Sequence, residues 1–236
     1  MRNKINQKVV IFIGPPGSGK GLQANLVAEK FGLYHIETSE LLERCFSEEK
    51  EKTFKIDSKR YQVKEIEKIW KSGKLCPPPF VVFLVKRKIK EVAQQKKGIV
   101  FSASPRTLYE GEKIVPLLEK LYSQKNIFVF YLKCPKSVLK KRLLSRRICS
   151  LLRHPILNLK GMEKLKRCPL DGSLLIKRKI DKPEILDKRF KEFEEKTFPL
   201  VDFFKKRKIK LFEIDARPLP EKIFKKIEKA LTNEPC

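Results

Sequence analysis

Short apolar runs alternate with amphipathic segments along most of the chain. The runs end at glycine or polar residues, which is typical of strands buried on both faces of a parallel sheet. They cover residues 8–14, 33–36, 98–104, 126–132 and 208–215. Because helical patterns separate these runs, the sequence predicts an α/β fold in which helices cover both faces of a five-stranded parallel sheet.

The helical patterns are clearest after the first strand, after residue 76 and after the last strand. In the first helix, apolar residues recur at the i, i+3, i+4 and i+7 spacing, at Ala24, Val27, Ala28 and Phe31. Gly32 follows as a helix-ending glycine. The second helix is predicted to follow the prolines at 77–79 and to run to Gly98. The apolar face of this second helix is formed by Val81, Leu84, Val85 and Val92. That of the third helix, after the last strand, is formed by Ile223, Ile227 and Leu231.

Two segments interrupt this alternation. Residues 38–74 are predicted to form short helices. The signals are Ser39 as a cap of one helix, Ile66, Ile69 and Trp70 as the apolar face of another, and Gly73 as its end. Residues 148–178 carry Cys, His, Pro, Asn and Gly without periodicity and are interpreted as an insertion. No internal repeat or Gly/Ser-rich linker is visible, so both insertions belong to one folded unit.

A glycine-rich loop joins the first strand to the first helix. Its sequence is GPPGSGKG, with Gly14 and Gly19 separated by four residues and Lys20 next. Gly17 and Gly19 permit backbone conformations that aim successive N–H groups inward, where they and the helix N-terminus bind phosphate oxygens. Lys20 adds a charge that can follow a transferring phosphoryl group. A strand before and an amphipathic helix after the loop are the setting that a phosphate-binding loop requires.

The chain is strongly basic. Its 236 residues, enough for a domain with a real core, include 55 Lys and Arg against 28 Asp and Glu, a net charge of +27. Such a surplus favours polyanions. The lysines are nevertheless spread along the whole chain, and no RNA-binding aromatic signature or zinc-finger helix is visible. We therefore interpret the charge as compositional and do not expect a nucleic-acid partner.

The interpretation of the six cysteines depends on the cellular compartment of the protein. No signal peptide or membrane-spanning run is visible, so we expect a cytoplasmic protein without a membrane partner. In a reducing compartment, metal ligation is a better explanation of paired cysteines than disulfides. Cys45, Cys76, Cys134 and Cys236 have no partner at ligand spacing and are interpreted as ordinary small residues. His35 falls in a predicted strand and is interpreted as structural.

The loop GPPGSGKGLQA resembles that of adenylate kinases and related nucleoside monophosphate kinases. The resemblance extends over nearly the whole chain, through residues 35–44, 72–78, 102–107, 141–147 and 178–190. It implies a P-loop core of residues 1–37, 77–147 and 179–236, a helical acceptor-binding insert of residues 38–76, and a lid of residues 148–178. It also implies a monomer that transfers the γ-phosphoryl group of ATP, bound with Mg²⁺, to a nucleoside monophosphate, AMP by resemblance.

The resemblance also assigns binding residues. Those for ATP are Gly14, Gly17, Ser18, Gly19, Lys20, Gly21, Leu22, Arg142, Arg146 and Pro218. Those for AMP are Thr38, Lys74, Leu75, Cys76, Ala103, Arg106, Glu110, Arg178 and Arg189. Gly21 is expected in this family, because the ligands of the magnesium ion come mostly from the nucleotide phosphates and water and not from a loop hydroxyl. Leu22 replaces a threonine that touches phosphate, so only its backbone N–H can still donate.

Five cations are the candidate catalytic residues. Transfer between two nucleotides brings anionic groups together, so the protein mainly positions them and neutralises charge. Arginine suits this because its guanidinium donates to phosphate oxygens in pairs and stays charged. By resemblance the set is Lys20, Arg106, Arg146, Arg178 and Arg189, with Arg106 and Arg178 on the acceptor phosphate and Arg146 and Arg189 on the donor phosphates. Arg142, over the donor base, and Arg146 are four residues apart and are predicted to share a helix face.

The predicted lid contains a candidate metal site. Cys149 and His154 are separated by four residues, and Cys168 and Asp171 by two, with thirteen residues between the pairs. Structural zinc takes four such ligands. The segment also resembles the zinc-bearing lids of some adenylate kinases, although Leu152 stands where their second cysteine falls. The alternative is a metal-free lid with incidental cysteines.

Several positions depart from the family pattern. Ser102 occupies the position of an aspartate that orders the water shell of magnesium, and Ala103 that of a glycine; Asp181 is another carboxylate that could serve the metal. Glu43 replaces a phosphate-binding arginine, and Arg44 points about 100° away around the helix. Glu110 replaces a glutamine that reads adenine, and a carboxylate cannot donate to the ring nitrogen.

These departures leave three interpretations open. The first is an active nucleoside monophosphate kinase with a low or altered acceptor preference. The second is a nucleotide-binding protein of the same fold that has lost phosphotransfer and acts as a sensor or interaction partner. The third, supported only by the charge of +27, is an RNA-associated P-loop protein. The retained arginines favour the kinase.

Overall fold

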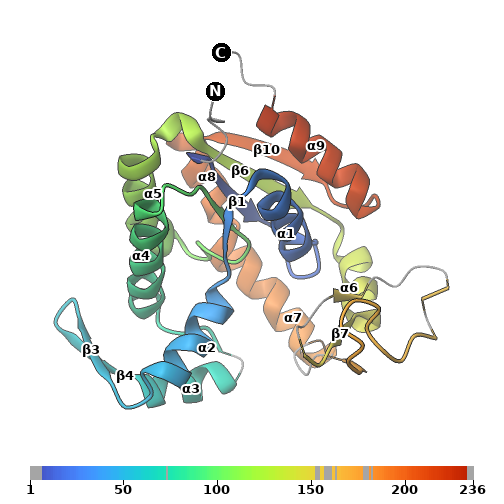
Figure 1. The fold of residues 1–236 in the computed structure, drawn as a ribbon, viewed down its shortest axis with the longest axis horizontal. Coiled ribbons are helices and arrows are strands. Elements are labelled where there is room, and N and C mark those ends of the chain that lie inside the picture. Colours follow the sequence, from blue (N-terminus) through green and yellow to red (C-terminus); the bar gives the residue numbers. More distant parts are fainter. Residues whose placement is uncertain are drawn as a thin grey trace.

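The computed structural model describes residues 7–72, 74–151, 155–156, 161–162, 164–177, 181 and 183–232. Five strands form one all-parallel sheet, which confirms the predicted fold class (Figure 1). The strands are β1 (Val9–Ile13), β2 (Tyr34–Ile36), β5 (Ile99–Phe101), β6 (Ile127–Lys133) and β10 (Lys210–Asp215). Their order across the sheet is β10-β6-β1-β5-β2, so β1 lies at the centre.

Strand β1 shows why these apolar runs lack alternation. All five of its residues are buried, because the sheet is covered on both faces. Val9 and Ile11 face one hydrophobic core, and Val10 and Phe12 face the other. The first core includes residues of α4, α5 and α8, and the second includes residues of α1 and α9. The predicted coverage of both faces is therefore confirmed.

The helices of the sheet region have the following bounds. They are α1 (Lys20–Phe31), α4 (Pro78–Gln94), α5 (Leu108–Tyr122), α6 (Lys136–Ser145), α7 (Pro183–Glu192), α8 (Pro199–Lys206) and α9 (Pro220–Thr232). A 3₁₀ turn at Gln124–Asn126 precedes β6, and a π-helical turn at Phe193–Thr197 joins α7 to α8. Helix α1 ends at Gly32 in the left-handed conformation, as predicted. Helix α4 ends at Gln94, before the predicted end at Gly98.

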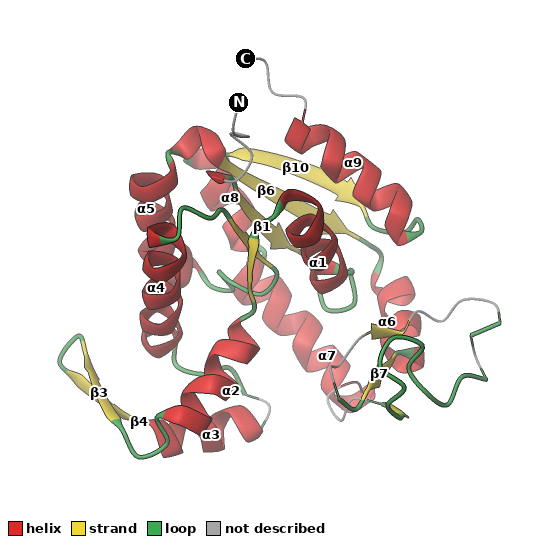
Figure 2. Ribbon diagram, in the orientation of Figure 1, coloured by secondary structure: helices red, strands yellow, loops and turns green. Residues whose placement is uncertain are grey.

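The prediction of helices alone for residues 38–74 is wrong. This segment forms α2 (Thr38–Glu48), an antiparallel hairpin of β3 (Thr53–Ile56) and β4 (Lys59–Gln62), and α3 (Val63–Lys71). Asp57 and Ser58 form the turn with φ angles of 45° and 66°. Two successive positive φ angles are typical of a type I′ turn, which matches the twist of the flanking strands. Figure 2 shows the hairpin projecting from one end of the molecule.

Packing on α4 explains why a hairpin forms here. Phe54 and Tyr61 face each other across the two strands, and both rings contact Phe80 of α4. The alternation of apolar and polar residues in TFKI is the signal of a half-buried strand. The predicted Ser39 cap is also wrong, because α2 begins at Thr38 and Glu37 is its N-cap. The Ser39 hydroxyl donates to the Glu37 carboxylate instead. Gly73 lies outside the described residues.

The described residues between 147 and 177 form a small irregular unit beside α6 and α7 (Figure 1). Its described strands are β7 (Arg147–Cys149), β8 (Pro155–Ile156) and β9 (Leu175–Ile176), which pair antiparallel in the order β8-β7-β9. This agrees with the predicted insertion, while the exact boundaries of the core, insert and lid stay a prediction. Among the described residues, no helix has the length and apolarity needed to cross a membrane.

Candidate functional site

The glycine-rich loop lies where β1 ends and α1 begins. Gly17 and Gly19 have φ angles of 82° and 93°, which side-chain-bearing residues rarely adopt. A Cβ atom on Gly17 would also lie 2.9 Å from Leu143. The first turn of α1 leaves the backbone N–H groups of Lys20 and Gly21 without helical acceptors. The loop therefore presents N–H groups and the positive end of the helix dipole to an anion.

Lys20 is held inside this loop. Its Nζ donates to the carbonyl oxygens of Gly14 at 2.6 Å and Pro15 at 3.0 Å. Burial, together with the smaller effect of the positive charges of Arg106, Arg189 and Arg146, lowers the pKa of Lys20 to about 7. Because charges shift a pKa appreciably only at short range, the three arginines lie near Lys20.

One carboxylate holds two of these arginines. Asp181 is buried and accepts from Nε and Nη2 of Arg146 at 2.7–2.9 Å, and from Nη1 of Arg189 at 2.9 Å. Such a two-pronged contact fixes the plane of the guanidinium. Burial also lowers the pKa of Arg189, although Asp181 opposes that effect. Asp181 was considered only as a carboxylate that could serve the metal, and its role as the partner of two arginines was not predicted. Its signal was its place in the 178–190 segment, between candidate arginines 178 and 189.

Arg106 approaches Lys20 from the loop after β5. Its Nε donates to the Ala103 carbonyl at 2.7 Å, and its own carbonyl accepts from Thr197. Its guanidinium is exposed, so it is available to an incoming anion. The fourth candidate, Arg178, lies outside the described residues.

The prediction that Arg142 and Arg146 share a helix face is wrong. Helix α6 ends at Ser145, and Arg146 follows as its C-cap with an extended backbone. The two guanidinium groups separate as a result. Arg142 donates to the carbonyl oxygens of Ala216 and Arg217 at 2.7 and 2.8 Å, which places it beside the predicted Pro218.

The predicted acceptor residues come from three segments. Thr38 opens α2, and its buried hydroxyl has no hydrogen-bond partner among the residues that the structure describes. Lys74 is exposed, Leu75 half-buried and Cys76 buried in the loop before α4. Burial raises the pKa of Cys76 to about 11, while Arg106 opposes that effect, so this loop lies near Arg106. An unpaired buried hydroxyl is costly and indicates a missing partner.

Glu110 is engaged by its own loop. One carboxylate oxygen accepts from the backbone N–H of Arg106 at 2.8 Å and from the Ser104 hydroxyl at 3.2 Å. Burial raises the pKa of Glu110, and these hydrogen bonds oppose the effect. The carboxylate therefore helps to set the course of the loop that carries Ala103 and Arg106.

Ser102 and His35 form a pair at the carboxyl ends of β5 and β2. The His35 Nε2 lies 2.8 Å from the Ser102 Oγ. Burial lowers the pKa of His35, whereas Glu37 raises it by a smaller amount. The strand position predicted for His35 is confirmed. The serine at this position is occupied by a hydrogen bond to the imidazole.

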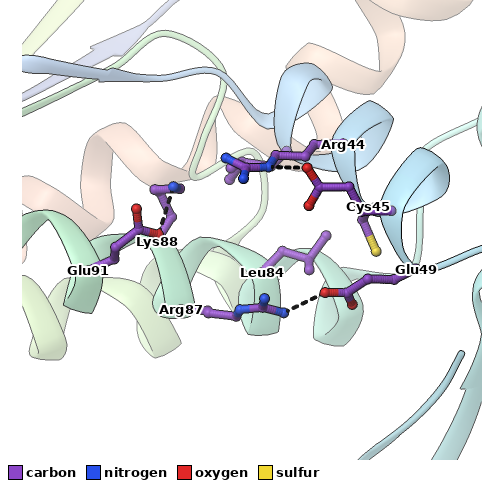
Figure 3. Close-up of a pocket in the computed structure, with 9 residues that line it drawn as sticks. Arg44, Cys45, Glu49, Leu84, Arg87, Lys88 and Glu91 are labelled. Carbon is purple, nitrogen blue, oxygen red and sulfur yellow. Dashed lines mark hydrogen bonds and ion pairs between the residues drawn. The ribbon is translucent and has the colours of Figure 1, made fainter.

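Arg44 lies in a separate pocket between α2 and α4. Arg44 pairs with Glu48 along α2. Figure 3 shows Arg87 of α4 reaching Glu49 at the end of α2. The Arg44 contact is 2.8 Å long and spans one helical turn. Arg44 therefore does not take the place of the arginine that Glu43 replaces.

Three of the predicted metal ligands are close together. The ligand atoms of Cys149, Cys168 and Asp171 all lie within 4.8 Å of one another, and both cysteines are buried. The backbone turns back on itself between Cys168 and Ser173, where the Cys168 N–H donates to the Ser173 carbonyl at 2.8 Å. His154 lies outside the described residues. Two thiols and a carboxylate at this separation fit a tetrahedral zinc ion.

The fold and the site define a class of protein. A phosphate-binding loop at the end of a central parallel strand, with lysine and arginines converging on it, is typical of P-loop phosphotransferases. A sequence profile of adenylate kinases matches residues 12–209. The chain belongs to the adenylate kinase family.

The chain is similar to several adenylate kinases, and each alignment covers almost the full length of both proteins. The chain is 30% identical to the adenylate kinase of Thermosipho melanesiensis over 92% of its own length and 96% of that protein. It is 31% identical to the adenylate kinase of Archaeoglobus fulgidus, over 94% and 97% of the two chains. It is 32% identical to that of Mesomycoplasma hyopneumoniae, over 96% and 99%. The resemblance to adenylate kinases predicted from the motifs is confirmed, and the chain is a phosphotransferase of the nucleoside monophosphate kinase kind.

Proposed function

We propose that this protein transfers the γ-phosphoryl group of MgATP to AMP, reversibly, giving two ADP. The observation that carries the proposal is the grouping of Arg106, Arg146 and Arg189 near the half-buried Lys20, with Asp181 joining Arg146 to Arg189. Four cations close together repel one another, so the arrangement favours a polyanionic occupant. Two nucleotides that meet at their phosphates supply that charge.

The donor half of the site would work by positioning and charge neutralisation. The N–H groups at the start of α1 would bind the β-phosphate region, and Lys20 would leave the Gly14 and Pro15 carbonyls to follow the transferring group. Arg146 and Arg189, oriented by Asp181, would donate to oxygens that gain charge in the transition state. Arg142 and Pro218 would border the donor base.

The acceptor half would lie between α2, the 74–76 loop and the loop after β5. The unpaired Thr38 hydroxyl would find its partner on the acceptor base, and Arg106, with Arg178, would bind the acceptor phosphate. The AMP phosphate is already ionised at neutral pH, so the reaction requires no general base from the protein. Closure of the 148–178 lid would exclude water and limit hydrolysis.

The test is a direct assay of ADP formation from MgATP with each nucleoside monophosphate. We expect AMP to give the highest kcat/KM. Tight ATP binding without ADP formation from any acceptor would instead support a nucleotide-binding sensor. That function is the second candidate because positions 43 and 102 depart from the family pattern. A different best acceptor would retain the kinase and reject AMP as its substrate.

We further propose that the lid binds one structural zinc ion through Cys149, Cys168 and Asp171, with His154 as the fourth ligand. The support is the proximity of the three described ligands and the burial of both thiols. Zinc would join β7 to the turn before β9, since Cys149 belongs to the strand and Cys168 to the turn.

The zinc site predicts a specific loss. Cys168→Ser should weaken zinc binding about 100-fold or more, because removing a ligand costs at least as much as removing one of its outer-shell partners. The measurement is zinc content by elemental analysis, followed by competition with a chromogenic chelator. Cys134→Ser is the matched control, because Cys134 packs against apolar residues of α6 and α7 and is not one of the proposed ligands. A parent protein without zinc, or equal zinc loss in both variants, would contradict the assignment.

A further inference from the structure

The β3–β4 hairpin concentrates positive charge that the candidate site does not use. Lys55 and Arg60 lie directly opposite each other across the two strands, and both are exposed. Lys59, also exposed, follows the turn. Like charges opposite each other destabilise an antiparallel pair, so this arrangement costs folding energy. Within the described part of the chain, none of the three side chains has an ion pair.

The packing of the hairpin directs this charge outward. Phe54 and Tyr61 occupy the face that contacts α4, with ring centroids 5.1–6.1 Å from Phe80 and Phe83. Successive residues of a strand point to opposite faces, so Lys55 and Arg60 lie on the face away from α4. Figure 1 shows the hairpin projecting at the end of the molecule opposite α9. The anchored hairpin therefore presents Lys55 and Arg60 on its free face, while the exposed Lys59 lies beside them at the turn.

We propose that this cationic hairpin, residues 53–62, is a docking surface for duplex DNA, contacted through the phosphate backbone. The argument is charge complementarity, because closely spaced cations without partners gain most from a regular array of phosphates. The major groove of B-form DNA admits a two-stranded ribbon, whereas that of duplex RNA is too narrow for one. Binding of this kind is independent of base sequence.

Other anionic partners fit the hairpin less well. Single-stranded nucleic acid is bound largely by stacking on aromatic rings, and the hairpin aromatics are packed against α4. A membrane surface favours cations beside exposed apolar side chains that insert between lipids. Ile56 is half-buried against the core and cannot serve that role. The proposal departs from the expectation of no nucleic-acid partner, because helices were predicted for this segment and only a hairpin brings Lys55 and Arg60 together on one face.

The experiment compares two triple variants of equal charge. Lys55→Gln/Lys59→Gln/Arg60→Gln neutralises the hairpin, and Lys222→Gln/Lys225→Gln/Lys229→Gln neutralises three exposed lysines of α9. The hairpin variant removes a like-charge pair, so thermal unfolding should show it at least as stable as the parent. Binding is measured by fluorescence anisotropy with a short labelled DNA duplex, across a series of salt concentrations.

We expect the hairpin variant to bind the duplex about tenfold or more weakly at about 50 mM salt, with a salt slope smaller by about 2 to 3, roughly one for each phosphate that the hairpin no longer neutralises. The α9 variant should match the parent. Equal weakening in both variants, or no binding by the parent, would overturn the proposal. So would tighter binding to single-stranded RNA, or a hairpin-dependent effect seen only with phosphatidylserine vesicles. Phosphotransfer assays are a separate readout, so this proposal and the proposed function can fail independently.

Discussion

Replacement of Lys20 by methionine should lower kcat about 10²- to 10³-fold, the usual cost of removing one group that stabilises transition-state charge. Methionine keeps the length and apolar stem of the side chain but cannot donate to a phosphoryl oxygen. The measurement is the steady-state rate of ADP formation from MgATP and AMP. Lys30→Met is the matched control, because Lys30 is an exposed residue of the same helix. A Lys20 variant with parental kcat would contradict the assignment of this lysine to phosphoryl transfer.

Loss of stability should not explain that result. The Lys20 pKa is about 7 in the folded chain and near 10.5 in the unfolded one. Between these values the unfolded chain holds more protons, so this lysine destabilises the fold near neutral pH and does so less as the pH rises. The methionine variant should therefore unfold at the parental temperature or above it.

The same pKa gives the Lys20 prediction a second readout. Phosphate groups beside Lys20 favour its charged form, so MgATP binding should raise its pKa and take up a proton. Near pH 8 most free protein has a neutral Lys20, and at pH 6 most is already charged, so proton uptake should be larger at pH 8. Calorimetric titrations in buffers of different ionisation enthalpy measure this uptake. Lys20→Met should abolish the difference between the two pH values.

The sheet and the phosphate loop could be predicted because their signals are local. An apolar run such as VVIFI can be buried on both faces only in a covered sheet, and the glycines before Lys20 permit conformations that other residues avoid. The hairpin at residues 53–62 was missed for a different reason. Its Asp57-Ser58 turn lacks the glycine that usually marks a type I′ turn, and its packing depends on Phe80, far along the chain.

The arrangement of the charged groups could not be predicted in the same way. Two arginines four residues apart suggest one helix face, but α6 ends between Arg142 and Arg146, so they reach different partners. The role of Asp181 depends on Arg146, 35 residues away, and no local pattern reveals that contact. The predicted convergence of arginines on Lys20 rested on resemblance, and the structure brings together the three that it describes.

The pairing of Ser102 with His35 changes what substitution at position 102 should do. An aspartate there restores the carboxylate that the family resemblance associates with the water shell of magnesium. In this chain, however, the carboxylate would lie beside the His35 imidazole, now 2.8 Å from the Ser102 hydroxyl. An imidazole so placed would donate a hydrogen bond to the carboxylate, and the carboxylate would raise the pKa of the imidazole. The imidazole would therefore compete with the hydrated metal ion for the carboxylate.

The double variant Ser102→Asp/His35→Gln should therefore raise kcat about 10-fold, the lower end of what an outer-shell ligand contributes. Ser102→Asp alone should gain less, and His35→Gln alone should have little effect, so the two changes should be coupled. The measurement is ADP formation as a function of Mg²⁺ concentration, where the double variant should also saturate at lower Mg²⁺. Ser102→Asn/His35→Gln is the matched control, since asparagine has the shape of aspartate without its charge. If the double variant is no faster than this control, the metal is managed without a carboxylate at the end of β5.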